Sequence, residues 1–493
     1  MPGRQQPNIV LVVLDTLTSN GAALGTGWMP WLDSLAERGA SYDHAVANAP
    51  WTYPSHASLF TGILPSEHRM ELPLSLHVPE GRGQLDQAAG RIERASPARH
   101  PRLAERWLPA LLGRAGYHTV LASNNPWVGR WGRMELGFDR IEDVPFAPLF
   151  RAPAVVRRRP RLRSGVRAGD FTYRVFRSRQ DLRAAETVAR VRSWASSRDR
   201  SRPAFLFVNL MEAHFPYFTP DARPAVRETG AGVATIYRAM RLIEVGRSFL
   251  YNMGMLERSR YDRPLQALRS LHRHAATYLD ARVAEIVQAV RDDGRGTVVA
   301  VASDHGDAFG EHAAVFHGIT LDEPILHVPV VVGGDGIASS STASTVELRQ
   351  LYATVCEAAG VEVPAGAAPS LLSGPGQGPV VAERDRSDTP PQVPLSTEAA
   401  ERLGRMRAVY ADPYKLVVGE RSERLYDLSR DPAESTDLAK DHPEVARRLR
   451  EALPPWPEAS AEDEGPDAEE PASLSAREQD EIARQLAALG YLE

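Results

Sequence analysis

The sequence predicts an α/β protein in which helices flank a doubly wound, mostly parallel β-sheet. The runs at residues 8–14 and 204–210 are almost entirely apolar, which is typical of strands buried on both faces of a parallel sheet. Stretches with helical spacing lie between the strand-like runs, and this favours the crossover connections of parallel strands. Beyond residue 400, short strand-like runs predict a small C-terminal α+β subdomain.

The other elements are predicted in chain order from apolar spacing and from the glycines that end helices. Helices are expected at residues 29–39, 102–116, 181–197, 233–256 and 265–291. Further strands are expected at residues 118–122, 297–302, 327–332, 407–411, 415–418 and 424–427. The polar stretch 75–100 is expected to form a loop over the site. The helix at 233–256 carries Met and aromatic residues, and it is either a packing helix or a substrate lid or membrane-surface element.

The length of 493 residues exceeds the usual size of one domain, so we expect a large domain with appendages. The catalytic α/β domain is assigned to residues 1–375 and the small C-terminal subdomain to residues 376–455. Within these, the Pro-, Gly- and Ser-rich stretch 363–400 is expected to be a linker or long loop. Residues 456–493 are interpreted as an acidic, disordered linker at 457–473 followed by a terminal helix at 475–489.

The composition is that of an ordinary globular protein, with 43% hydrophobic and 25% charged residues. The net charge of -5 gives no indication of nucleic-acid binding. The single cysteine, Cys356, excludes an internal disulfide framework and is expected in the core of an amphipathic helix. The first apolar run is too short for a signal peptide, and no run is long enough to cross a bilayer. We therefore expect a cytoplasmic protein without a transmembrane segment.

Residues 151–202 carry 16 Arg against four acidic residues. One interpretation is a solvated surface insertion. The other is a flap that attracts an acidic substrate, a lipid headgroup or a polyanion, with peripheral membrane contact as one consequence. Nucleic acid is the least favoured ligand because few aromatic residues are interleaved with the arginines.

The stretch 50–62 has the pattern of a helix start that faces a reactive centre. Pro54 suits the first turn of a helix and Gly62 suits its end, which places Thr52 just ahead of the helix N-terminus. Free backbone N–H groups and the positive end of the helix dipole favour an anion at such a place. The alternative is that Thr52 or Ser55 only caps the helix.

Polar residues follow three of the apolar runs. Asp15 ends the first, Glu212 and His214 follow the run 204–210, and Asp304 and His305 follow the run 297–302. In open α/β sheets the carboxyl ends of the strands lie side by side and carry the ligand site. Carboxylates, an imidazole and a hydroxyl gathered at one place form a plausible metal shell. His312 and His317 add to the histidines near this edge, although loop packing explains His312 equally well.

With these residues in hand, the chain resembles the sulfatase branch of the alkaline phosphatase superfamily. The sulfatase nucleophile motif C-x-P-S-R, followed by T-G, corresponds to residues 52–56 and to Thr61-Gly62 here. The resemblance runs over most of residues 8–333 and resumes at Asp412-Pro-Tyr-Lys-Leu and Leu425-Tyr-Asp-Leu. It implies an alkaline-phosphatase-like sheet and a small closing subdomain.

The resemblance also implies the roles of the site residues. The metal ligands would be Asp15, Thr52, Asp304 and His305. The catalytic residues would be Thr52 as nucleophile, His214 as the acid for the leaving group, and His317 and His56 beside the anionic oxygens. One divalent ion (Mn, Ca, Mg or Zn) is expected, because Thr16 occupies the position where many sulfatases carry a further metal-binding Asp.

The departures from the family pattern decide the expected reaction. Sulfatases oxidise the nucleophile residue to an aldehyde, but oxidation of Thr52 would give a ketone. His56 stands where the motif has Arg, so the charge there depends on pH. We therefore expect hydrolysis of phosphate monoesters or diesters through a covalent intermediate on Thr52. The alternatives are a sulfuric ester hydrolase, a transferase of phosphoryl or phospho-headgroup units, and an inactive binding protein; the partner would be an anionic small molecule or lipid-like ester.

Overall fold

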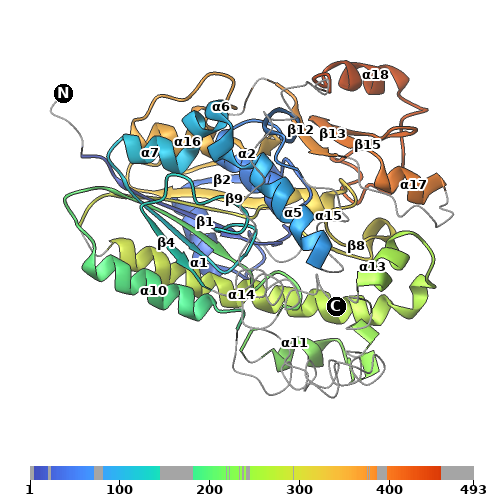
Figure 1. Cartoon of the computed structure of the whole chain (residues 1–493). Coiled ribbons are helices and arrows are strands. Elements are labelled where there is room, and N and C mark those ends of the chain that lie inside the picture. The colour runs from blue at the N-terminus through green and yellow to red at the C-terminus, as the bar shows by residue number, and fades with distance from the viewer. Residues whose placement is uncertain are drawn as a thin grey trace.

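A computed structural model gives the fold of the chain. It describes residues 5–456 except 20–23, 72–81, 145–180, 218, 221, 233, 236–237, 240–241, 243–244, 292–293, 375, 377 and 386–396. Figure 1 shows a central sheet between two layers of helices, with a second, smaller sheet near the C-terminal part of the chain. The predicted fold class is confirmed.

The strand order of the central sheet in the described part of the chain is β10-β2-β9-β6-β1-β5-β3-β4, with β11 also paired to β2. The strands are β1 (Asn8–Leu14), β2 (Ala40–Val46), β3 (His118–Ser123), β4 (Arg140–Asp143), β5 (Ala204–Leu210), β6 (Thr297–Ala302), β9 (His327–Gly334), β10 (Ser340–Thr342) and β11 (Val346–Glu347). Strand β1 is parallel to both β5 and β6. Strand β9 is antiparallel to β6 and β2, so the sheet is mixed on that side.

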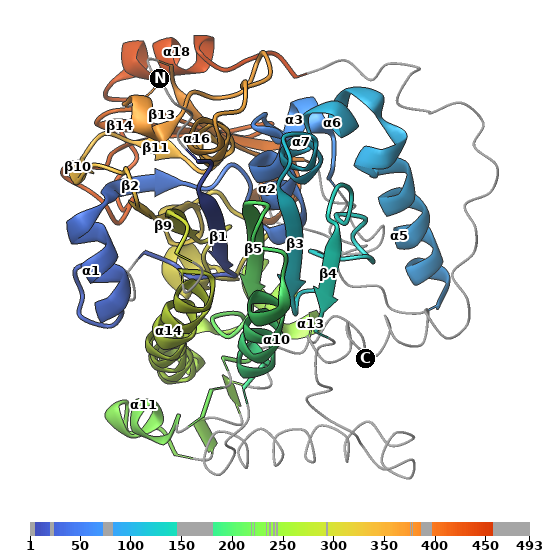
Figure 2. The same ribbon diagram turned by 90° about the vertical axis from the view of Figure 1, so that its left-hand side faces the viewer.

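Helices cover both faces of this sheet (Figures 1 and 2). On one face lie α2 (Thr52–Thr61), α7 (Leu108–Arg114) and α16 (Gln350–Ala359), whose apolar side chains share a core with the sheet. On the other face lie α1 (Pro30–Arg38), α10 (Ala184–Ser197) and α14 (Asp262–Arg291). All seven residues of β1 and of β5 are buried, which explains why both strands read as almost continuous apolar runs.

Shorter elements connect these layers. They are α3 (Pro65–His68), α5 (Arg82–Ala95), η1 (Pro97–Arg99), α6 (Pro101–Arg106), α11 (Arg223–Glu228), α13 (Val245–Asn252), η2 (Arg258–Arg260), β7 (Ala308–Phe309), η3 (Glu311–Ala313), β8 (Val315–Phe316), α15 (Glu323–Leu326), η4 (Leu371–Ser373) and α17 (Thr397–Leu403). Within the described residues, no helix is long and apolar enough to span a bilayer.

The C-terminal sheet is antiparallel, in the order β12 (Val380–Arg384), β13 (Met406–Ala411), β14 (Tyr414–Val418) and β15 (Glu423–Asp427). One face packs against α18 (Pro443–Glu451), and the other contributes residues to the main core. Because the two sheets share a core, the small sheet is fastened to the large one. The domain boundaries themselves stay a prediction.

Four sequence-based expectations are corrected. The helix expected at 102–116 is two helices, since α6 ends at Arg106 and Pro109 lies in the first turn of α7. The loop expected at 75–100 contains the helix α5, and the linker expected at 363–400 contains the buried strand β12. Helix α2 begins at Thr52 itself, so Thr52 is the first helical residue rather than the residue ahead of the helix.

Several expectations fall largely or wholly outside the described residues. The Arg-rich insertion is described only from residue 181, where its predicted helix corresponds to α10. The acidic linker and terminal helix at 457–493 are not described. In the stretch 233–256, α13 is the element described with bounds.

Cys356 is buried in α16, and burial raises the pKa of its thiol to about 12, which fits a core residue.

His68 offers a test of how α2 is fastened. Met70 N–H donates to Nδ1 of His68 (3.0 Å), so Nε2 carries the proton and donates to Ser58 Oγ on α2 (3.0 Å). Burial lowers the pKa of His68 to about 3, so the folded protein holds the ring neutral while the unfolded chain protonates below pH 6.5. Stability is therefore complete above pH 6.5 and falls as the pH drops toward 3.

We expect His68→Gln to remove this acid dependence. Between pH 7 and pH 5 the free energy of unfolding of the wild type should fall by about 2 kcal/mol more than that of the variant, measured by urea unfolding. Ser58→Ala, which keeps the ring, should retain the acid dependence of the wild type. Equal losses for wild type and His68→Gln would contradict this account.

Candidate metal and nucleophile site

The predicted site residues come from three neighbouring strands. Strand β1 lies between β6 and β5, and Asp15, Asp304 and His214 follow the carboxyl ends of β1, β6 and β5. The N-terminus of α2 brings Thr52 to the same edge, where its Oγ1 lies 3.3 Å from His305 Nε2. Parallel register makes adjacent strands end together, so residues almost 300 positions apart meet here.

Asp15, Asp304 and His305 form a buried group suited to a cation. One ligand atom of each lies within 4.8 Å of the ligand atoms of the other two. The Oδ1 atom of Asp15 and the Oδ2 atom of Asp304 are buried and have no hydrogen-bond partner in the described part of the protein. His305 donates from Nδ1 to the carbonyl of Gly306 (3.1 Å), which places its lone pair on Nε2, 3.4 Å from Asp304 Oδ2.

The remaining oxygens of the two carboxylates are held by amides. Asn125 Nδ2 donates to Asp15 Oδ2 (2.6 Å), with Asn209 Nδ2 farther away at 3.5 Å. The backbone N–H groups of Thr16 and His305 lie 3.2 and 3.0 Å from Asp304 Oδ1. Each carboxylate is thus oriented through one oxygen and presents the other to the shared space.

The buried carboxylates of Asp15 and Asp304, beside the neutral ring of His305, favour the binding of a cation. Burial, and next to it the charge of Asp15, raise the pKa of Asp304 well above its usual value. Burial also lowers the pKa of His305 well below its usual value, so the ring is neutral and its lone pair can bind a metal. Two buried acids, a neutral imidazole and unpartnered oxygens together fit a divalent cation.

His56 is oriented toward Thr52 and the cation group rather than toward an open position. Its Nδ1 donates to the carbonyl of Thr52 (2.9 Å), and its Nε2 accepts from Asn209 Nδ2 (3.2 Å). Burial lowers the pKa of His56 to about 4, so the ring is neutral. Because both ring nitrogens are engaged, we revise the expected role beside a substrate oxygen: His56 positions the backbone of Thr52.

His214 and His317 lie together on the other side of His305. The ring centroids of His317 are 5.3 Å from His214 and 4.4 Å from His305. His214 donates from Nδ1 to the carbonyl of Phe215 (2.8 Å), and burial lowers its pKa. His317 donates from Nδ1 to Asp307 Oδ1 (2.6 Å), which directs proton exchange to its Nε2.

Asp307 is a site residue that sequence reasoning missed. It is buried, and its second oxygen accepts from the hydroxyl of Tyr217 (2.8 Å). Burial by itself would raise its pKa, but the neighbouring His317 and the hydrogen bond to it lower the pKa below its usual value. The signal in the sequence was Asp304-His305-Gly306-Asp307, in which a second acid follows the first by three residues.

Asn125 and Asn209 were also missed, since amides carry no distinctive spacing in the sequence. Two other polar residues of the strand ends lie elsewhere. Glu212 accepts from the backbone N–H of Ala184 (2.7 Å) and so caps α10, and burial raises its pKa to about 8. His312 lies 3.6 Å from Glu434 of the C-terminal part, consistent with a packing role.

Comparison with known proteins identifies the family. The family model described as Sulfatase matches residues 7–361. Over 165 residues the chain is 31% identical to Delta 4,5-hexuronate-2-O-sulfatase of Bacteroides thetaiotaomicron, which covers 32% of this chain and 33% of that protein. The chain therefore matches about a third of the length of this relative.

Two further similarities extend over nearly the whole chain. The chain is 23% identical to arylsulfatase K of Xenopus laevis over 498 residues, covering 92% of this chain and 82% of that protein. The solved structure of phosphonate monoester hydrolase of Agrobacterium radiobacter superposes with a TM-score of 0.62 at 18% identity, covering 90% of this chain and 94% of the other. At this identity the structural similarity establishes the fold alone.

Removing one buried acid tests the cation group. In the presence of a chelator we expect Asp304→Asn to stabilise the protein by about 1–4 kcal/mol, because the variant no longer keeps a second acid beside Asp15. Added Mn²⁺ or Ca²⁺ should raise the melting temperature of the wild type much more than that of the variant. Differential scanning fluorimetry with chelator and with each ion measures both effects.

Asp280→Asn is the matched control. Asp280 is a buried acid outside the site that accepts from the backbone N–H groups of Trp31 and Leu32 (2.9 Å each). Its replacement should destabilise the protein equally with chelator and with ion. An Asp304→Asn protein that responds to ions as the wild type does would show that Asp304 is not a ligand.

Proposed function

This chain belongs to the sulfatase family of the alkaline phosphatase superfamily, and from that premise we propose that it is a metal-dependent hydrolase of phosphate esters that uses Thr52 as its nucleophile. The observation that carries the proposal is the position of Thr52. Its hydroxyl lies at the first residue of α2, 3.3 Å from the lone-pair nitrogen of His305, which belongs to the same buried group as Asp15 and Asp304.

The residue type favours direct attack. An aldehyde requires a carbon with two hydrogens next to the oxygen, and the carbinol carbon of Thr52 has only one. Thr52 therefore enters the reaction as an alcohol, as expected of a phosphoryl-transfer nucleophile. The positive end of the α2 dipole contributes about 0.3–1 kcal/mol in favour of the ionised hydroxyl.

The proposed residues divide the work of the reaction. Asp15, Asp304 and His305 would hold a divalent cation, which when bound lowers the pKa of a neighbouring hydroxyl and neutralises negative charge. Thr52 loses its hydroxyl proton to solvent, Oγ1 attacks phosphorus, and the bond from phosphorus to the leaving alcohol breaks. His214 is the proposed proton donor: its Nε2 first takes a proton from solvent and then passes it to the leaving oxygen. His317 Nε2, oriented by Asp307, contacts an oxygen of the transferring group, and water then releases Thr52.

Hydrolysis of sulfate esters through unmodified Thr52 is the second candidate. What favours it is the naming of the curated relatives, among them a hexuronate sulfatase and arylsulfatase K. What favours phosphorus is the alcohol nucleophile, together with the fold shared with a phosphonate monoester hydrolase. The two candidates share the site and differ in the group transferred, so one assay separates them.

The decisive experiment compares Thr52→Ala with the wild type on aryl phosphodiesters, aryl phosphonate monoesters, aryl phosphomonoesters and aryl sulfates, each with added Mn²⁺, Zn²⁺, Mg²⁺ or Ca²⁺. We expect the wild type to turn over the phosphorus esters best and Thr52→Ala to lose at least about 10³-fold in kcat, because the covalent route is closed. Thr52→Ser should retain part of the activity.

Thr61→Ala supplies the control, since Thr61 lies on the same helix and donates only to the carbonyl of Ala57 (2.7 Å). Its activity should stay close to that of the wild type. Full turnover by Thr52→Ala would refute the nucleophile. A wild type faster on aryl sulfate than on every phosphorus ester would instead favour the second candidate.

Asp307→Asn tests the orientation of His317. The amide keeps the shape of the carboxylate, but it cannot accept from both His317 and Tyr217 through two equivalent oxygens. We expect kcat to fall by about 10- to 100-fold with a smaller change in KM, and the pH profile of kcat to shift. Tyr217→Phe, which leaves the bond to His317 in place, should lose much less. An unchanged pH profile in Asp307→Asn would exclude this role.

A further inference from the structure

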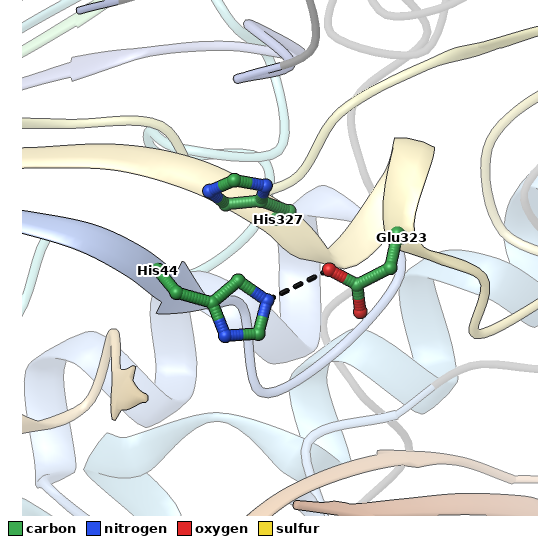
Figure 3. Close-up of side chains that lie close together, drawn as sticks. All are labelled: His44, Glu323 and His327. Atoms are coloured by element: carbon green, nitrogen blue, oxygen red, sulfur yellow. Dashed lines mark hydrogen bonds and ion pairs between the residues drawn. The ribbon is translucent and has the colours of Figure 1, made fainter. Parts of the chain in front are cut away.

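A second group of metal-type ligands lies outside the site described above. His44 on β2, Glu323 at the start of α15 and His327 at the start of β9 gather there (Figure 3), and one ligand atom of each lies within 4.8 Å of the other two. We propose that this group binds a zinc-class divalent ion that fastens the C-terminal sheet to the main sheet. The proposal is independent of the proposed function.

Hydrogen bonding fixes which nitrogen of His44 faces Glu323. Nδ1 of His44 lies 2.8 Å from Thr345 Oγ1, and that hydroxyl gives its own proton to Asp412. Thr345 therefore accepts, and Nδ1 carries the proton. The other nitrogen, Nε2, lies 2.7 Å from Glu323 Oε2, so two atoms with lone pairs face each other. A positive charge must stand between them, which is either a further proton or a metal ion.

His327 is arranged in the same way. Its Nε2 lies 3.0 Å from the carbonyl oxygen of Asp43, and a carbonyl only accepts, so this nitrogen is the donor. The lone pair of the neutral ring is then on Nδ1. Metal-binding histidines almost always donate their second N–H to a carboxylate, a backbone carbonyl or water, which fixes the ring and its tautomer. His327 has such a carbonyl in place, and the N–H of His44 is held by the Thr345 hydroxyl, which is itself bonded to the carboxylate of Asp412.

Glu323 is held through one oxygen and leaves the other for a ligand role. Its Oε1 accepts from Lys415 Nζ (2.9 Å) and from the hydroxyl of Tyr410 (2.8 Å), while Oε2 faces His44 alone among the contacts described. Lys415 also contacts Glu434 Oε1 (2.6 Å), so its charge is shared with a second acid. With Asp322 nearby, three carboxylates surround one lysine, and Arg424 lies 3.8 Å from Asp322.

The donor set indicates the class of ion. Two imidazoles and one carboxylate suit zinc, with the fourth position open to water or a solvent ligand. They suit calcium and magnesium poorly, because those ions prefer oxygen ligands. The side chains of His44 and Glu323 are 18% and 7% exposed, so an ion can enter without unfolding.

The ligand group lies where the C-terminal sheet meets the main sheet, so a bound ion would act on the contact between the two sheets. Lys415 and Tyr410 lie on β14 and β13 of the C-terminal sheet, and Asp412 between them holds Thr345. His44, Glu323 and His327 belong to the main sheet and its connections. An ion at this junction orders three side chains at the point where the two sheets join, and it should therefore stabilise their contact.

The test uses the full-length protein and needs two variants. Asp15→Asn/Asp304→Asn removes the ligands of the first site and leaves this group untouched. We expect this variant still to bind one equivalent of Zn²⁺, measured by mass spectrometry of the metal after gel filtration. Bound Co²⁺ should give the strong visible absorption of a low-coordinate site, and Zn²⁺ should raise the melting temperature. Adding His44→Gln/His327→Gln should abolish all three signals.

His312→Asn is the matched control, because His312 lies at the same junction but outside the ligand group. In the first-site variant it should leave one equivalent bound. If the Asp15→Asn/Asp304→Asn protein binds no Zn²⁺, or if His44→Gln/His327→Gln leaves the stoichiometry unchanged, the proposal is wrong. The first of these outcomes requires no change in the group itself, so the test decides even where the histidine variants fail to fold.

Discussion

The structure depends on a pair of buried acids that lack a counter-charge of their own. Asp15 and Asp304 lie side by side at the end of the central strands, and each keeps one oxygen without a hydrogen-bond partner among the described residues. A buried carboxylate is costly unless it is paired or bound to a metal. The neighbouring rings of His56 and His305 are neutral, so they supply no positive charge to balance the two carboxylates. The need for a cation at this point explains the residues around it better than any single motif does.

The sheet makes this arrangement possible. Strands β6, β1 and β5 are adjacent and parallel, so the residues after them meet at one edge although they are far apart in the chain. Their apolar side chains give the edge a rigid base on which two acids can be held. Helix α2 begins with Thr52 at the same edge, where its hydroxyl lies 3.3 Å from His305. The proposed reaction depends on this placement of a hydroxyl at the edge that carries the two acids.

The basic side chains described around Thr52 are histidines rather than lysines or arginines. The chain has only two lysines, Lys415 and Lys440, and both lie in the C-terminal part. Around Thr52 the described groups are His56, His214, His305 and His317, three of which burial keeps neutral. His56, where the family motif has Arg, holds the backbone of Thr52 in place of carrying charge. In the proposed function, positive charge at the centre would then come mainly from the cation, which would make the proposed activity dependent on it.

The sequence by itself determined the fold class, the edge of the sheet that carries the site, and the residue types gathered there. Apolar runs buried on both faces leave a strong local pattern, and the polar residues that end them stand out against it. Only the tertiary structure decided which polar side chains take part. Asp307, Asn125 and Asn209 join the site, Glu212 caps α10, and the three ligands at the junction of the two sheets come together from separate elements. A side chain's partner is set by where its neighbours end in space, and spacing along the chain does not record that.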